Sequence, residues 1–338
     1  MAAIATVALH SPIQEGEQAK EQQMSFDPTT LRRDDYGFFG PDSPSWKIWT
    51  APTAVIGFQR AVVLEHFDPF LTAAVADSHG IYTDPRSRLD HTFAYFLLVA
   101  IADGRTAIQA SEHLMQVHAP MTGIEPISGR RYGANSPETQ LWIHITGWHS
   151  VLKAYEVFGP GPLSPEEEAR YWRECAIAAE LQTCKPEDVP RSREEVRAYF
   201  AKVRPSLCTS ERAEAGMHHL LWTSPRNGAG ISYALGSRLL SLASVATLPK
   251  WMRELGRFDR WGIVDLLVRP AAKTIVWGSA AFNSFGLIAA APFIAPMAGQ
   301  ILEQHLKGEP PARLETITPS EARRLYGGRG RRAIAEVG

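Results

Sequence analysis

The stretch from Arg88 to Trp148 constrains the fold of this chain more than any other, because it joins helical periodicity to a high density of histidine. Six of the 11 histidines fall between positions 79 and 149: His79, His91, His113, His118, His144 and His149. The apolar residues around them recur at three- and four-residue steps, which predicts three successive helices. Helices that direct neutral imidazoles inward commonly hold a haem iron or another transition metal, so the stretch predicts a cofactor site.

The second of these predicted helices, over residues 107–121, indicates how a cofactor would be placed. Its predicted inward face consists of Ala107, Ser111, Leu114, His118 and Met121. Small residues at one end and an imidazole at the other would let a flat macrocycle approach closely. Alternatively, His118 is a hydrogen-bonded core histidine beside alanine and leucine. Helix geometry by itself leaves both interpretations open.

Composition narrows the class of protein. With 45% apolar and 21% charged residues, the chain can bury a large core. Its net charge of −1 gives the protein as a whole no attraction to nucleic acid or to an anionic membrane. Its three cysteines, Cys175, Cys184 and Cys208, are odd in number and lack metal-binding spacing. Together with an apolar start that lacks a basic region, this predicts a cytoplasmic protein without disulfides.

The order of segments predicts one large helical domain with tails at both ends. Residues 1–26 read as a disordered tail, residues 27–306 as the domain, and residues 307–338 as a solvated Arg- and Gly-rich tail. The domain begins with a loop-like arm over residues 27–50, rich in Pro, Gly, Asp and Ser, whose aromatic side chains would anchor it on the domain surface.

One segment near the carboxyl end, Thr274 to Leu302, carries no charge over 29 residues. Its length would suffice to span a bilayer. Pro292 and Pro296, together with polar residues and glycines, interrupt it, so a buried helix packed into the domain is the preferred interpretation over a membrane segment.

The chain contains no Rossmann or Walker glycine pattern, no HExxH and no nucleophile elbow. Several short motifs remain, in a fixed order. They are Arg88-Leu89-x-x-Thr92, Val117-His118-x-x-Met121-x-Gly123, Tyr132-x-Ala134-x-x-Pro137, Trp142-Ile143-His144, Gly161-Pro162-Leu163-Ser164 and Leu248-Pro249-x-Trp251-x-Arg253. In this order and spacing, over about residues 45–270, the chain resembles the family of the oxygenase MpaB, which also contains the rubber oxygenase called latex clearing protein.

The resemblance implies an all-α, globin-like core that binds one b-type haem and carries out oxygen chemistry. It places the axial histidine at His118, the family's arginine and threonine at Arg88 and Thr92, and a further histidine at His144. The latex-cleaving members have a lysine where this chain has His91. They also use a glutamate as a base, and the nearest candidate here, Glu65, stands at a different spacing.

The chemistry of these side chains agrees with such roles. A guanidinium can pair with a haem propionate, and Thr92 lies on the same helical face four residues after Arg88. The alternative partner of Arg88 is Asp84, which is also four residues away. His91 would be either a second axial ligand or a hydrogen-bond donor to bound dioxygen.

Three hypotheses for function follow. The first is a haem b-dependent oxygenase that acts with dioxygen on a small apolar substrate. The second is a non-catalytic haem sensor or carrier, in which His118 and His91 both ligate the iron. The third is a helical scaffold without cofactor, whose histidines satisfy hydrogen bonds in the core.

Overall fold

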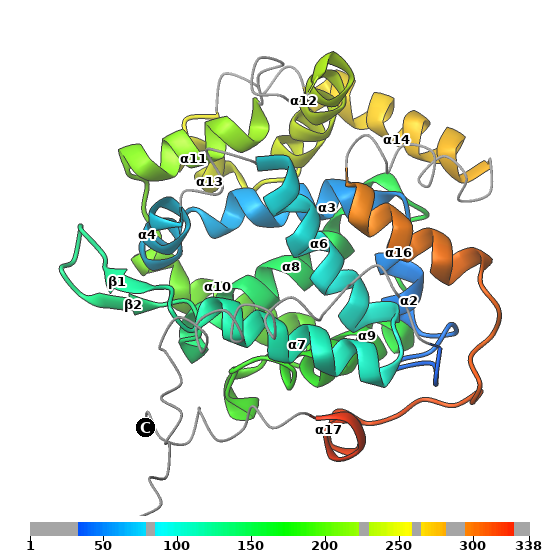
Figure 1. The fold of residues 1–338 in the computed structure, drawn as a ribbon. Helices are drawn as coiled ribbons and strands as arrows, with labels where there is room; N and C mark the ends of the chain where they lie inside the picture. Colours follow the sequence, from blue (N-terminus) through cyan, green and yellow to red (C-terminus); the bar gives the residue numbers. More distant parts are fainter. Residues whose placement is uncertain (1–32, 79–84, 223–229, 259–264, 282–294, 328–338) are drawn as a thin grey trace, which may run out of the picture.

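A computed structural model describes residues 33–78, 85–222, 230–258, 265–281 and 295–327 (Figure 1). These residues are predominantly helical, which confirms the predicted all-α class. The longer helices are α3 (Thr53–Glu65), α4 (Pro69–Asp77), α6 (Pro85–Ile101), α7 (Gly104–His118), α8 (Pro137–Phe158), α9 (Pro165–Ala179), α10 (Arg193–Val203), α11 (Glu211–Leu221), α12 (Gly230–Ala246), α14 (Asp265–Ala281) and α16 (Pro296–Lys307). Shorter ones are α2 (Pro44–Trp49), α13 (Lys250–Leu255) and α17 (Pro319–Tyr326), with single 3₁₀ turns at Pro186–Asp188 and Arg204–Ser206.

Side-chain caps fix where several helices begin. Ser136 accepts a hydrogen bond from the Thr139 amide at the start of α8, and Pro137 fills the first helical position. The N-cap of α7 lies earlier in the sequence than the predicted helix start at residue 107. Asp103 occupies that position, and its carboxylate accepts from the Thr106 amide at 2.8 Å. Helix α7 therefore begins at Gly104, three residues earlier than its periodicity indicated.

The centre of the molecule is the contact between α3 and α8, which run side by side (Figure 1). Gly57 lies at their closest approach. A Cβ atom at this position would stand 2.5 Å from the Cα of Val151 and 2.8 Å from the carbonyl oxygen of Ser150. The missing side chain therefore allows the two backbones to approach each other.

Aromatic side chains fill the core between α2, α6 and α8. Trp49 stacks on Phe96, with ring centroids 5.4 Å apart, and meets Trp148 edge-on. Tyr171 of α9 closes the cluster, and its hydroxyl donates to the Trp148 carbonyl at 2.8 Å. Trp49 has no exposed surface, so the end of the amino-terminal arm belongs to the core rather than to the domain surface.

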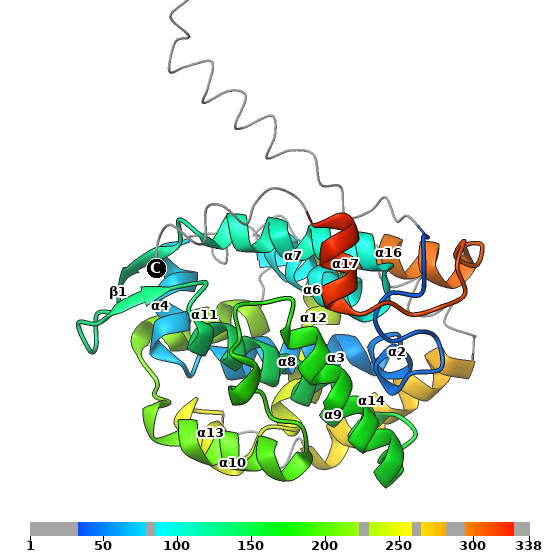
Figure 2. The same ribbon diagram turned by 90° about the horizontal axis from the view of Figure 1, so that it is seen from below.

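The two ends of the described chain pair with each other. The Tyr36 amide donates to the Glu315 carbonyl, and the Ile317 amide donates to the Gly37 carbonyl. Helix α17 then packs on α7, as Figure 2 shows from below, and Ala322 is fully buried there. The prediction of a solvated tail is therefore wrong for residues 308–327. Residues 1–32 and 328–338 lie outside the described residues.

The charge-free segment is not one buried helix. Its first part belongs to α14, where Ile275 and Trp277 are more than half exposed and Val276 is buried. Its last part begins α16, where Ile301 and Leu302 are buried against α6. Residues 282–294 lie outside the described part. Within that part, no helix is long and apolar enough to cross a bilayer.

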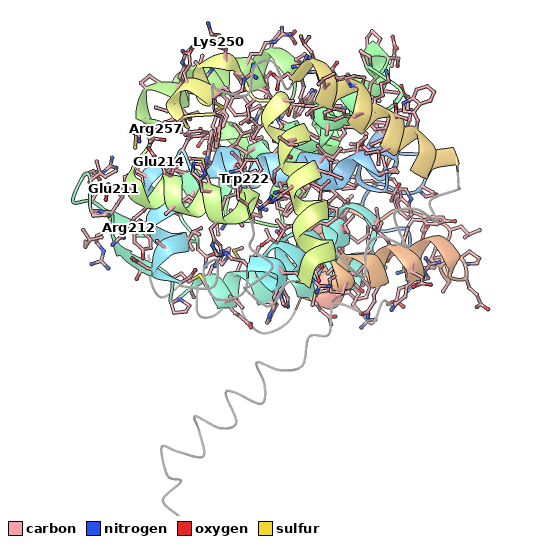
Figure 3. All side chains as sticks on the ribbon, turned by 90° about the horizontal axis from the view of Figure 1, so that it is seen from above. Glu211, Arg212, Glu214, Trp222, Lys250 and Arg257 are labelled. Atoms are coloured by element: carbon pink, nitrogen blue, oxygen red, sulfur yellow. The ribbon has the colours of Figure 1, made fainter. Side chains whose placement is uncertain are left out.

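A small hairpin and α11 cover the side of the molecule near α4. Strands β1 (Thr122–Ile124) and β2 (Arg131–Gly133) pair antiparallel. The hydroxyl of Tyr132 donates to Asp77 of α4 at 2.7 Å, which holds the hairpin in place. On the far side of α11, Glu214 pairs with Arg257 at 3.3 Å, and Figure 3 shows the two side by side.

Candidate active site

A cavity of about 530 Å³ lies among α3, α4, α6, α7 and α8. Side chains of α11 and α16 complete its wall through Leu220 and Met297. Most of the wall is apolar. The charged or titratable residues that line it are Glu65, His66, Arg88, His91, Tyr95, His113 and His118. An apolar cavity with a few convergent polar groups is the usual form of a small-molecule site.

Helix α6 brings three of the predicted site residues to this cavity, namely Arg88, His91 and Thr92. The Arg88 guanidinium donates to the Ser78 hydroxyl at 2.6 Å, and burial lowers its pKa. The Thr92 hydroxyl donates to the Arg88 carbonyl at 2.9 Å. The alternative partner of Arg88, Asp84, lies outside the described residues.

His91 is held by its own helix. Its Nδ1 lies 2.7 Å from the carbonyl oxygen of Ser87, one turn earlier. A carbonyl can only accept, so Nδ1 carries a proton, and in the neutral imidazole Nε2 then keeps its lone pair. A histidine that donates one ring nitrogen to a carbonyl and keeps the other bare is oriented as a metal ligand.

Helix α7 turns a different face to the cavity from the one predicted. Its lining residues are Ala110, His113, Leu114, Val117 and His118, followed by Met121. Ser111, which was expected on this face, donates instead to the carbonyl of Leu181. Leu114, His118 and Met121 line the cavity as predicted. In place of Ala107 and Ser111, however, the helix presents Ala110, His113 and Val117, each one position away from the predicted three- and four-residue steps.

His118 is the last residue of α7 and is half-buried. Burial, reinforced by the charge of Arg88, lowers the pKa of His118 to about 4. Its Nδ1 lies 3.2 Å from Nε2 of Gln140, whose amide also donates to the Ala134 carbonyl at 2.6 Å. The imidazole is therefore neutral at physiological pH, as iron ligation requires.

Glu65, the last residue of α3, lies at the cavity as a buried carboxyl. Burial raises the pKa of Glu65 to about 7, against the opposing effects of the Thr146 hydroxyl and the Arg88 charge. The Thr146 hydroxyl lies 3.3 Å from its Oε1. A carboxyl in this range is able to hold and release a proton near neutral pH.

Sequence reasoning missed His66, which also lines the cavity. Its Nδ1 lies 2.7 Å from the Val62 carbonyl, whereas its buried Nε2 has no hydrogen-bond partner among the described residues. Burial lowers the pKa of His66 to about 4. The missed signal was its position four residues after Val62 at a helix end, where an imidazole can reach back to the last turn.

His144 stands apart from the other candidates. It is buried in α8 but is not among the residues that line the cavity. Its Nε2 lies 2.7 Å from the Cys175 carbonyl, and burial lowers the pKa of His144 to about 4. His144 therefore does not line this cavity, although its buried Nδ1 has no partner in the part of the chain that the structure describes.

Comparison with known proteins decides the family. The catalytic-domain family of the ER-bound oxygenase mpaB/B′ and the rubber oxygenase matches residues 46–279, from α2 to α14. The chain belongs to this family. The resemblance found in the sequence motifs is thereby confirmed, and this enzyme carries an oxygenase catalytic domain. No curated protein and no solved structure matches the chain.

The residues matched by the family include nearly all of those that line the cavity. Every lining residue except Met297 falls within residues 46–279. Among the described residues, no group of three or more His, Cys, Asp and Glu side chains is arranged to hold a metal ion.

Proposed function

We propose that this protein is a haem b-dependent oxygenase that acts with dioxygen on a small apolar substrate. The observation that carries the proposal is the cavity itself, an apolar chamber of about 530 Å³ lined by several imidazoles, among which burial lowers the pKa of His66 and of His118 to about 4. Its apolar wall suits both a macrocycle and an apolar substrate. The family match adds the oxygenase class of chemistry.

The residues present fit a haem. The resemblance assigns the axial position to His118, and Nδ1 of His91 donates to the Ser87 carbonyl, which leaves Nε2 of the neutral ring available as a ligand. The Arg88 guanidinium would hold a propionate, with Thr92 beside it on the same face of α6. When bound, haem iron supplies the one-electron and dioxygen chemistry that amino-acid side chains lack.

Glu65 is the group in this wall suited to move a proton. Its carboxyl is protonated in about half of the molecules near pH 7, because burial raises its pKa to about that value. The nearby Arg88 charge and the Thr146 hydroxyl stabilise the ionised form. Glu65 would therefore accept a proton from a substrate carbon or oxygen and return it later.

A non-catalytic haem sensor or carrier is the second candidate. It is favoured by the presence of both His91 and His118 in the same cavity wall. Tight ligation by both would leave no iron position for dioxygen. In that case the reduced protein would bind carbon monoxide and dioxygen slowly or not at all.

The deciding experiment is an absorption spectrum of protein expressed with added haem precursor. The wild type should show a Soret band, and His118→Ala should fold but purify largely without haem. His113→Ala, which removes another imidazole from the same wall, is the matched control and should keep the band. A wild type without haem would contradict the proposal, and full absorbance in His118→Ala would contradict the ligand assignment.

A further inference from the structure

We propose that the outer face of α14 is a membrane-docking surface, which lies on the headgroup region of a bilayer without crossing it. Five of the nine large hydrophobic side chains that are exposed in the described part of the chain lie on α12 and α14. They are Leu239, Leu266, Leu267, Ile275 and Trp277, each 57–78% exposed. In Figure 1 the two helices lie together at the rim of the molecule.

Helix α14 contacts the protein through a narrow stripe. Val268, Ala272 and Val276 recur every four residues and pack with Ala243 and Leu240 of α12 in a small apolar cluster. The rest of its described surface is exposed. One turn of helix takes about 3.6 residues, so this spacing defines a single line of contact along the axis.

The side of α14 opposite this stripe is apolar instead of charged. At about 100° per residue, Leu266, Leu267 and Trp277 project within roughly 60° of the direction opposite the stripe. Pro270 and Thr274 complete that outward face, and no charged residue interrupts it. A helix on the surface of a soluble domain normally shows the reverse pattern, with polar residues facing water.

The charges on α14 are arranged beside this face and are positive. Lys273 lies with its ammonium 5.7 Å from the centre of the Trp277 ring, and Arg269 lies on the same flank, where its guanidinium donates to the Ala246 carbonyl at 2.7 Å. The acidic residue of the helix, Asp265, is paired with Arg253. The flank therefore offers net positive charge next to an apolar face.

This combination favours a membrane over the other possible occupants. Lysine and arginine beside a face of tryptophan and leucine are typical of helices that lie in the interfacial plane, where the cations reach anionic headgroups. A second copy of the chain docked across a two-fold axis, with the two α14 helices antiparallel, would bring the Lys273 flank close to its own counterpart. Such like-charge contacts oppose a dimer through this face.

Vesicle flotation tests the inference on the full-length protein. Vesicles of phosphatidylcholine with about one-fifth phosphatidylserine should carry the wild type upward, and vesicles of phosphatidylcholine alone should carry several-fold less. The double variant Leu267→Glu/Trp277→Glu should lose at least ten-fold in the bound fraction, since it places two carboxylates in the apolar face. Lys273→Glu should reduce binding to the anionic vesicles only.

Leu314→Glu is the matched control, because Leu314 is 71% exposed but lies outside α12 and α14. It should float like the wild type. All the substituted side chains are exposed, and thermal unfolding followed by circular dichroism will check that each variant is folded. The haem spectrum is a separate readout, so failure of this inference does not bear on the proposed oxygenase.

Three results would overturn the inference. The first is that the wild type binds neither kind of vesicle. The second is that the double variant floats to the same extent as Leu314→Glu. Alternatively, sedimentation equilibrium would show a wild-type dimer that the double variant converts to monomer, which would identify the face as a contact between two copies.

Discussion

The side-chain nitrogen Nε2 of Gln140 lies between the Ala134 carbonyl and the imidazole of His118. It is 2.6 Å from the carbonyl oxygen and 3.2 Å from Nδ1 of His118. The short contact to a carbonyl fixes this nitrogen as the donor, so it also donates to His118. Nδ1 of His118 is then an acceptor and its proton resides on Nε2. An imidazole that binds iron through Nε2 needs the opposite tautomer.

Substitution of Gln140 should therefore change how well His118 holds iron. Gln140→Glu supplies an acceptor for Nδ1–H, which leaves Nε2 bare and makes the imidazole a stronger ligand. We expect haem to dissociate roughly ten-fold more slowly from Gln140→Glu than from Gln140→Met, because methionine offers His118 no strong partner. Transfer of haem to excess apomyoglobin measures both rates, and equal rates would mean that Gln140 does not orient the ligand.

His91→Ala should change the spin state of the ferric protein. With Nδ1 bound to the Ser87 carbonyl, His91 has a lone pair at Nε2 and can occupy the second axial position. We expect the wild type to be at least partly six-coordinate and low-spin, and His91→Ala to shift toward high spin. After reduction, carbon monoxide should bind the variant faster. An unchanged ferric spectrum would place His91 away from the iron.

The sequence predicted the helices more reliably than the directions in which they face. Arg88, His91 and Thr92 lie close together on one helix, so local spacing was enough to bring them to one cavity wall. For α7, apolar periodicity predicted a face that includes Ser111, but that side chain bonds to the Leu181 carbonyl. This contact involves a segment 70 residues away, and no local pattern encodes it.

His66 and α14 illustrate two further limits of the sequence. His66 belongs to no histidine pair on its own helix, and only the tertiary fold brings it into the wall with Arg88 and His118. In α14, the uncharged sequence around Trp277 suggested burial. Burial depends on which neighbours are available, and α12 covers only the stripe that contains Val276.

Gly57→Ala should destabilise the protein strongly, whereas Gly278→Ala should not. The new Cβ at position 57 would lie 2.5 Å from the Cα of Val151, so α3 and α8 must separate. We expect a loss of about 3 kcal/mol, as for overpacked cores. A Cβ at Gly278 meets nothing within 4 Å, and alanine should add up to ~1 kcal/mol there through its higher helix propensity. Chemical denaturation measures both, and similar effects at the two positions would contradict the α3–α8 packing.

Glu65→Gln should remove one contribution to the free energy of unfolding, the one that decreases as pH rises from about 4.5 to 7. Burial raises the pKa of Glu65 from 4.5 to about 7, so between these values the folded protein binds more protons than the unfolded chain. The contribution of Glu65 to stability is then fully present below about pH 4.5 and is lost as pH rises through 7. Buried His66 has the opposite sign, because its pKa falls from 6.5 to about 4 and its contribution is lost on acidification.

The difference between wild type and Glu65→Gln isolates the carboxyl, since both proteins keep the same histidines. Relative to the variant, the wild type should lose roughly 3 kcal/mol between about pH 4.5 and pH 8, at about 1.4 kcal/mol for each pKa unit. Urea titrations of both proteins at several pH values measure this difference. A difference that is constant across the range would mean that the carboxyl of Glu65 titrates normally, and it would then be ionised at neutral pH and unable to deliver a proton in the cavity.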